Sequence, residues 1–69
     1  MRNKMSDIGQ TIREARREID LTQEGLAELA GVSIRSLQNI ESGGNPTVYQ
    51  VGKVLEALGL KLKIEPINK

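Results

Sequence analysis

The 69-residue chain has no cysteine and no histidine, and its only aromatic residue is Tyr49. Without cysteine, the chain can form neither a disulfide nor a thiolate metal site. Without histidine, it lacks the commonest general base and the commonest metal ligand. A single tyrosine offers no stacking platform for single-stranded nucleic acid. We therefore expect no enzyme, no cofactor and no metal site.

Long apolar runs are also absent. No stretch approaches the roughly eighteen apolar residues of a membrane span, and the basic amino terminus has no signal-peptide core. These absences predict a cytoplasmic protein without a membrane partner.

The net charge is only +1, so bulk charge gives weak support for nucleic-acid binding. The charge is unevenly distributed, because residues 1–17 are mainly basic and residues 18–42 hold five acids against Arg35 alone. A chain this short buries a marginal core, which favours stabilisation by a second subunit.

The stretch from Thr22 to Gly43 predicts two short helices joined by a sharp turn. Thr22 and Ser33 are N-cap residue types, and Gly31 between them can adopt the positive φ that ends a helix. Apolar residues recur at helical spacing on both sides of the turn. They are Leu26, Ala27, Leu29 and Ala30 in the first helix, and Ile34, Leu37 and Ile40 in the second. This spacing is typical of a DNA-binding helix-turn-helix, whose second helix lies in the major groove.

Two further helices are expected around this pair. The first follows a short, mobile basic arm (residues 1–5) and runs from an N-cap at Ser6 to about Asp20. The last begins at Thr47, which forms a T-x-x-Q capping box with Gln50, and ends at Gly59. The residues expected to face the core are Ile8, Ile12, Ala15 and Ile19 in the first helix, and Val48, Val51, Val54, Leu55 and Leu58 in the last. Residues 6–58 then form one all-α, four-helix DNA-binding domain.

The carboxy-terminal segment, residues 59–69, changes from helical spacing to strict alternation. Leu60, Leu62 and Ile64 alternate with charged residues, as on one face of a β-strand. No other strand is evident in the chain, so its simplest partner is the same strand of a second copy. The sequence thus predicts a homodimer joined by an antiparallel two-stranded ribbon.

The outward side of the second central helix carries the side chains expected to read bases. Arginine bonds guanine bidentately, asparagine and glutamine do the same to adenine, and an aliphatic group contacts the thymine methyl. The expected base-reading residues are Ile34, Arg35, Ser36, Gln38 and Asn39. The residues expected at backbone phosphates are Gln23, Ser42, Gly43, Gly44 and Asn45.

The chain resembles the lambda-repressor-like (Xre-type) helix-turn-helix family in the stretch LTQEGLAELAGVS and in LQNIESG. The resemblance spans roughly Ile8 to Leu58 and implies double-stranded DNA, with a palindromic operator, as the partner. It also implies a structural ion pair between Arg16 and Glu41, and a phosphate contact by Gln23. Gly25 departs from the family, which usually has a better helix former there.

The ending EALGLKLKIEPI is similar to that of a smaller group, the HipB-like antitoxins. That resemblance implies a HipA-like serine/threonine kinase toxin as a further partner. The leading hypothesis is therefore a repressor that is also an antitoxin. The alternatives are a plain Xre-type regulator without a toxin, and a protein-interaction module that has lost DNA binding.

Overall fold

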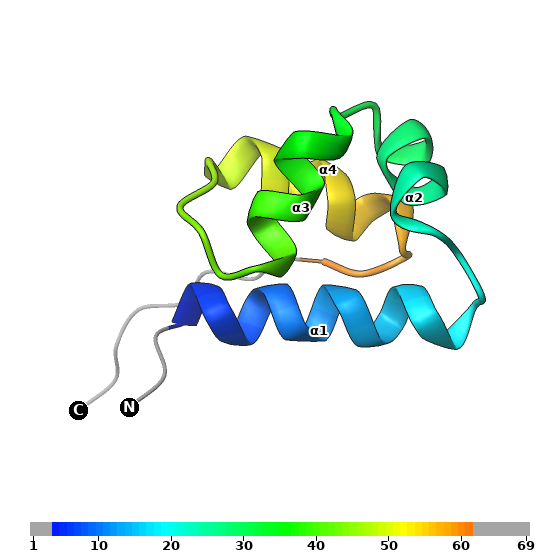
Figure 1. Ribbon diagram of the computed structural model, residues 1–69, viewed down its shortest axis with the longest axis horizontal. Helices are drawn as coiled ribbons and strands as arrows, with labels where there is room; N and C mark the ends of the chain where they lie inside the picture. The colour runs from blue at the N-terminus through cyan, green and yellow to red at the C-terminus, as the bar shows by residue number, and fades with distance from the viewer. Residues whose placement is uncertain (1–3, 62–69) are drawn as a thin grey trace.

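Four helices make up the part of the chain that this computed structural model describes, residues 4–61, with side chains described from residue 8 onward. Helix α1 spans Lys4–Glu18, α2 Gln23–Ala30, α3 Ile34–Glu41 and α4 Val48–Ala57. In Figure 1, α1 lies along one side of the molecule beneath α3, with α4 behind α3 and α2 at the far end. The expected four-helix fold is confirmed, and residues 4–61 contain no strand.

Helix α1 differs from its expected bounds at both ends. It begins at Lys4, before the expected cap at Ser6, because lysine and methionine are good helix formers that extend it backward. It ends at Glu18, and Asp20 adopts the left-handed region with φ 55°. The backbone N–H of Leu21 then donates to the Arg16 carbonyl at 3.1 Å. Aspartate is one of the few residues besides glycine that tolerates this conformation, which is why the chain turns here.

The helix-turn-helix forms as the sequence predicts. Thr22 Oγ1 accepts a hydrogen bond from the Gly25 N–H at 2.9 Å, and Ser33 Oγ accepts one from the Ser36 N–H at 3.0 Å. Gly31 lies between the two helices with φ 73°. A Cβ on Gly25 would lie 3.0 Å from Leu21 Cδ1 and 3.2 Å from Thr22 Oγ1. This glycine therefore leaves room for the capping residues beside it.

Helix α4 begins with both halves of the expected capping box and ends in a glycine turn. Thr47 Oγ1 accepts from the Gln50 N–H at 3.1 Å, and Gln50 Oε1 accepts from the Thr47 N–H at 3.4 Å. After the helix, Gly59 adopts φ 74° and the Leu60 N–H donates to the Leu55 carbonyl at 2.8 Å. Leu60 and Lys61 are not in a strand. The rest of the expected dimer strand, including Leu62 and Ile64, lies outside the described residues, as do residues 1–3 of the expected arm.

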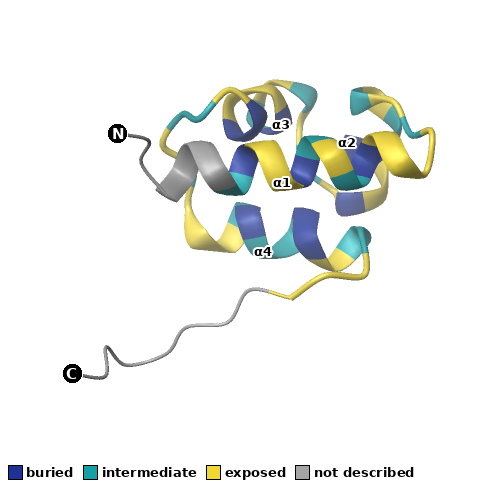
Figure 2. Cartoon of the chain, turned by 90° about the horizontal axis from the view of Figure 1, so that it is seen from below, coloured by how far each residue is buried: buried dark blue, intermediate teal, exposed yellow. Residues whose placement is uncertain are grey.

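The core lies where the helices meet, on the buried faces shown dark blue in Figure 2. It consists of Ile12, Leu26, Ala27, Ala30, Leu37, Ile40, Val51, Val54 and Leu55. Three residues expected in it are exposed: Ile19 by 58%, Leu29 by 65% and Val48 by 66%. Ile19 follows the end of α1, so helical spacing no longer applies to it. Leu29 points away from the narrow buried stripe of α2, and Val48 begins α4 where the chain leaves a loop.

Helices α1 and α3 approach each other closely at Gly9, whose importance the sequence did not indicate. A Cβ at this position would meet the Ile40 carbonyl oxygen and would lie 3.2 Å from Glu41 backbone atoms. Only glycine fits, because backbone atoms cannot move aside as a flexible side chain can. Gly9 therefore sets the distance between the first helix and the end of the third. Within residues 4–61, no helix is both long and apolar enough to cross a bilayer.

Candidate nucleic-acid interface

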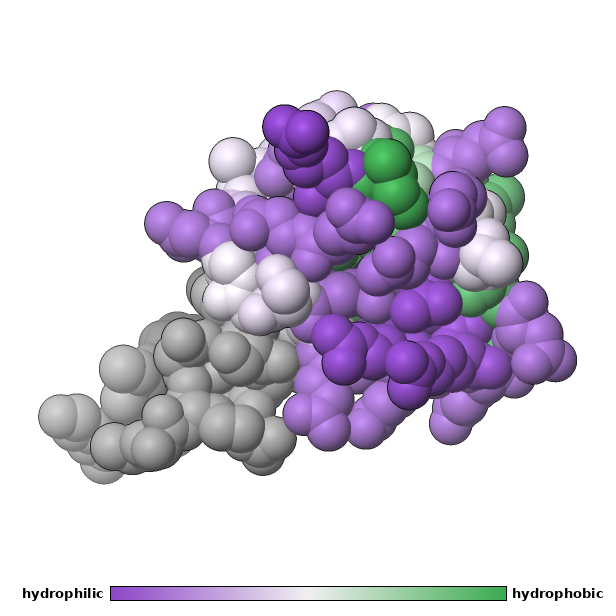
Figure 3. Space-filling model, viewed as in Figure 1, coloured by the Kyte–Doolittle hydropathy of each residue, from purple (hydrophilic) through white to green (hydrophobic). Residues whose placement is uncertain are grey.

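Helix α3 presents a polar outer surface, held by short caps at both ends. Arg35, Gln38 and Asn39 are exposed, whereas Ser36 is half-buried. Ile34 is also half-buried and packs against the core, so only part of its side chain is available outside. In Figure 3 the face that includes α3 and α1 is largely hydrophilic, as expected of a surface that meets a polar partner. The structure thus brings the five expected base-reading residues together on one helix.

Ser36 is joined to the caps of two helices. Its Oγ accepts hydrogen bonds from Ser33 Oγ at 2.9 Å and from Gln50 Nε2 at 3.2 Å. Gln50 belongs to the capping box of α4, so one side chain links the amino ends of α3 and α4. The sequence identified Gln50 only as a capping residue and gave no signal for its contact with α3.

The loop after α3 uses its polar groups to end that helix. The N–H groups of Gly43 and Gly44 donate to the carbonyls of Ile40 (3.2 Å) and Asn39 (2.8 Å), and Ser42 Oγ donates to the Asn39 carbonyl at 3.1 Å. The two glycine amides expected at phosphates are therefore already bonded within the chain. The Asn39 side-chain amide lies in the space that a Cβ on Gly44 would occupy. Asn45, the remaining loop candidate, is exposed.

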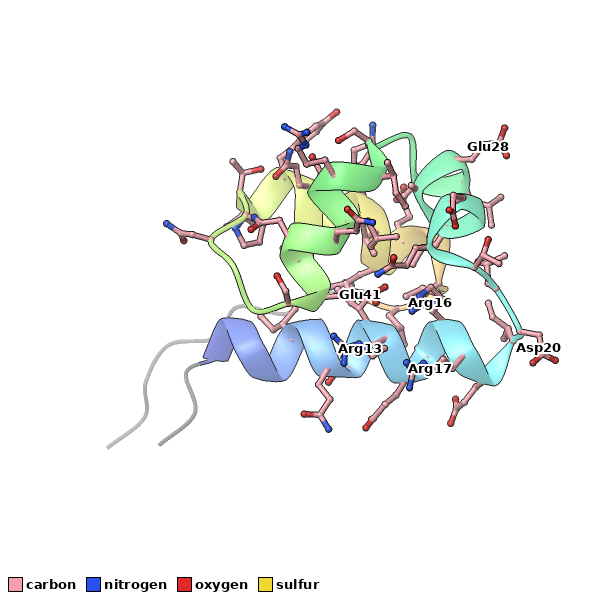
Figure 4. All side chains as sticks on the ribbon, in the orientation of Figure 1. Arg13, Arg16, Arg17, Asp20, Glu28 and Glu41 are labelled. Atoms are coloured by element: carbon pink, nitrogen blue, oxygen red, sulfur yellow. The ribbon has the colours of Figure 1, made fainter. Side chains whose placement is uncertain are left out.

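The expected ion pair between Arg16 and Glu41 is present and buried. Arg16 Nε and Nη2 donate to the two carboxylate oxygens of Glu41 at 2.8 and 3.0 Å, a bidentate arrangement. The side chains are only 11% and 1% exposed. Arg16 Nη1 also donates to the Leu21 carbonyl at 2.9 Å. Figure 4 shows Arg16 and Glu41 pointing toward each other between α1 and α3.

Two more side chains complete this network around Glu41. Gln23 Nε2 donates to Glu41 Oε1 at 3.2 Å, so the residue expected at a phosphate also joins α2 to the end of α3. Arg13 Nη2 donates to the Glu41 carbonyl at 2.9 Å. Arg13 was not among the residues expected in this network. Its position three residues before Arg16 could have indicated this contact, because residues three apart lie on the same side of a helix.

The pKa values of both partners are shifted in opposite directions. Burial alone would raise the pKa of Glu41. The hydrogen bonds from Arg16 and Gln23 and the charges of Arg16 and Arg13 outweigh burial, so the pKa of Glu41 lies below its ordinary 4.5. The hydrogen bond to Glu41 raises the pKa of Arg16. Both groups therefore stay charged at neutral pH.

An open cleft of about 470 Å³ lies beside this network at the amino end of α2. Its lining residues are Arg13, Arg16, Arg17, Thr22, Gln23, Glu24 and Glu41. Arg17 is exposed, unlike Arg16. Within the described residues, no group of three or more carboxylates, histidines or cysteines is placed to hold a metal ion.

Comparison with known proteins identifies relatives with the same helix-turn-helix fold. The sequence model of the helix-turn-helix family matches residues 12–64. An uncharacterized HTH-type transcriptional regulator, y4mF, of Sinorhizobium fredii (strain NBRC 101917 / NGR234) is 45% identical over 53 residues, 77% of this chain and 67% of that protein. Among solved structures, the restriction-modification controller protein C.AhdI from Aeromonas hydrophila is similar, with a TM-score of 0.75 and 31% identity. That match covers 83% of this chain and 88% of the controller protein.

Proposed function

The chain belongs to the helix-turn-helix family of Xre-type transcriptional regulators, and from this premise we propose that it is a sequence-specific, homodimeric DNA-binding repressor. The observation that carries the proposal is the outer surface of α3. Arg35, Gln38 and Asn39 are exposed there on a helix that is capped at its start and fixed at its end by the buried Glu41. A rigid helix with such side chains suits the major groove, where each base pair presents a distinct set of donors and acceptors.

We assign base reading to α3 and backbone contacts to its neighbours. Arg35 suits guanine, Asn39 and Gln38 suit adenine, and the exposed part of Ile34 suits a thymine methyl. For phosphates, Gln23 remains the leading candidate, because its amide nitrogen keeps a second hydrogen beyond the one that bonds Glu41. Asn45 extends this set. We leave out the Gly43 and Gly44 amides and the Ser42 hydroxyl, since all three donate within the chain.

The dimer remains part of the proposal on the strength of the alternating segment 60–65. Two reading helices are needed for a palindromic operator, with half-sites about one DNA turn apart (~34 Å). The net charge of +1 also argues for two copies, because one copy neutralises few phosphates.

The narrower hypothesis of a HipB-like antitoxin rests on the carboxy-terminal sequence alone, most of which lies outside the described residues. Neither relative has a name that refers to a toxin, so we do not extend the proposal to a HipA-like kinase. Co-purification of the tagged chain with a kinase encoded beside it would support that extension. Without such a neighbouring reading frame, the plain regulator stands.

The proposed function can be tested by selection from a pool of DNA duplexes with a randomised central segment. The wild-type chain should enrich a palindrome, and Arg35→Ala should lower affinity for it by about 1–3 kcal/mol by relaxing preference at one position in each half-site. Gln23→Ala should weaken binding to all sequences alike, because phosphate contacts carry no base information. If the wild-type chain enriches no sequence, the protein is not a sequence-specific repressor and the interaction module becomes the better hypothesis.

A further inference from the structure

Gln50 has a fixed orientation, which the capping box of α4 determines. Its Oε1 accepts the hydrogen bond from the Thr47 backbone N–H, and an N–H can be met only by an acceptor. The amide nitrogen is therefore the atom that faces Ser36, at 3.2 Å. Because an amide nitrogen donates and does not accept, the Ser36 hydroxyl oxygen must accept this bond.

The hydrogen-bonding capacity of Ser36 can then be counted. A serine hydroxyl has two lone pairs and one hydrogen. One lone pair accepts from Gln50 Nε2, and the hydroxyl oxygens of Ser33 and Ser36, 2.9 Å apart, share one hydrogen. Gln50 therefore occupies one lone pair of Ser36 and makes no demand on its hydrogen. When Ser33 supplies the shared hydrogen, the Ser36 hydrogen is free for an outside acceptor.

We infer that Ser36 acts toward DNA as a hydrogen-bond donor, and that Gln50, on a different helix, is the positioning residue that leaves the Ser36 hydrogen available. The inference rests on the proposed function. Its partners would be acceptors on a base edge: guanine O6 or N7, adenine N7, or thymine O4. Cytosine presents only an amino donor in the major groove, so Ser36 discriminates against cytosine on the strand that it contacts.

The substitution Gln50→Glu should reverse this polarity while preserving the fold. A carboxylate still accepts from the Thr47 N–H, as in the common form of the capping box. It cannot donate to Ser36, so the Ser36 hydrogen turns toward it and one lone pair of Ser36 becomes free. Ser36 would then accept from an outside donor, such as the amino group of cytosine or adenine.

The added negative charge requires a control, because it weakens DNA binding at every sequence. Val48→Glu supplies the same charge at a 66% exposed position in the first turn of α4, where the structure shows no bond to Ser36. Ser36→Ala removes the hydroxyl itself. Gln50→Met removes the donor without adding charge, and serves as a second test should Gln50→Glu fold poorly.

The experiment exposes full-length wild type and each variant to the same randomised duplex pool and compares base preferences by sequencing. Gln50→Glu should raise the share of cytosine or adenine at one position per half-site by about threefold to tenfold, the effect of one net hydrogen bond. Ser36→Ala and Gln50→Met should relax preference at that same position. Val48→Glu should lower affinity and keep the wild-type preferences. In the Ser36→Ala background, Gln50→Glu should change no preference.

If Gln50→Glu and Gln50→Met keep the wild-type preferences, as Val48→Glu should, Gln50 does not position a base-reading group and the inference is wrong. The proposed function would survive that result, because the wild type still selects a sequence. If the wild-type chain selects no DNA sequence, the proposed function and this inference are both wrong.

Discussion

Glu41 carries a charge in a place where an isolated charge would be unstable. Its side chain is 1% exposed, and it is stable there because Arg16 bonds both carboxylate oxygens and Gln23 bonds one of them. In a buried pair of this kind, desolvation offsets much of the attraction, so removing both charges costs less than removing one. The network joins the first, second and third helices at one residue, the last residue of α3.

Arg16→Ala should lower the free energy of unfolding by about 3–5 kcal/mol, because it leaves Glu41 buried without its main partner. Urea denaturation followed by circular dichroism measures this change. Arg17→Ala, at the exposed neighbouring position, is the matched control and should stay within about 0.5 kcal/mol of wild type. The double variant Arg16→Ala/Glu41→Ala should be more stable than the sum of the two single changes predicts. Additive effects would show that the two residues do not stabilise each other.

The lowered pKa of Glu41 predicts how stability depends on pH. A group whose pKa is lower in the folded state binds a proton more readily when unfolded, so it stabilises the fold above its ordinary pKa of 4.5. That contribution should be lost as the pH falls from 4.5 through the folded-state pKa. Urea midpoints measured from pH 7 downward should show the loss in wild type, and Glu41→Gln should show a smaller one. Parallel curves for the two proteins would assign the acid sensitivity to other carboxylates.

In the helices, the features predicted correctly from the sequence are those that depend on residues close together along the chain. The caps at Thr22, Ser33 and Thr47 and the turn at Gly31 each involve groups within a few positions along the chain. Features that depend on packing between helices were not predictable in the same way. Helical spacing marks an apolar stripe on a helix. The part of that stripe that another helix covers depends on how the two helices cross. Leu29 belongs to the apolar stripe of α2 but is not covered, and it is therefore exposed.

The base-reading surface shows the same division between local and distant causes. The exposure of Arg35, Gln38 and Asn39 follows from their place opposite the buried residues of α3. The contact between Ser36 and Gln50 joins residues fourteen positions apart, and it exists only because α4 packs beside α3. The two glycine amides after α3, which were expected at phosphates, donate to carbonyls at the end of their own helix.

Two glycines within helices should respond in opposite ways to alanine. Gly52→Ala should raise the free energy of unfolding by about 0.5–1 kcal/mol, because the added Cβ would meet no other helix or side chain within 4 Å and alanine is the better helix former. Gly9→Ala should lower stability, since its Cβ would meet backbone atoms of Ile40 and Glu41. Thermal denaturation of both variants against wild type tests the pair. Equal effects would mean that α1 and α3 do not cross closely at Gly9.

For the whole molecule, the central question is how two copies would present their reading helices together. The described residues form a core from all four helices. We propose that the apolar residues of the alternating segment form a contact between subunits. An antiparallel ribbon across a two-fold axis would place the same residues of both chains against each other and fix the spacing of the two α3 helices.

The full-length double variant Leu62→Lys/Ile64→Lys should be monomeric, because it places four lysines of two chains on the proposed apolar face of the ribbon, where like charges repel. Lys63→Gln, on the opposite face of the same strand, is the matched control and should remain dimeric. Analytical ultracentrifugation at micromolar concentration distinguishes the two states. The monomeric variant should also lose affinity for a palindromic operator while keeping its helical circular dichroism spectrum, because the substitutions leave the described core of the four helices unchanged. A dimer that survives the double substitution would mean that the subunits meet through another surface, and the exposed side chains of Leu29, Val48 and Tyr49 would then be the next to substitute.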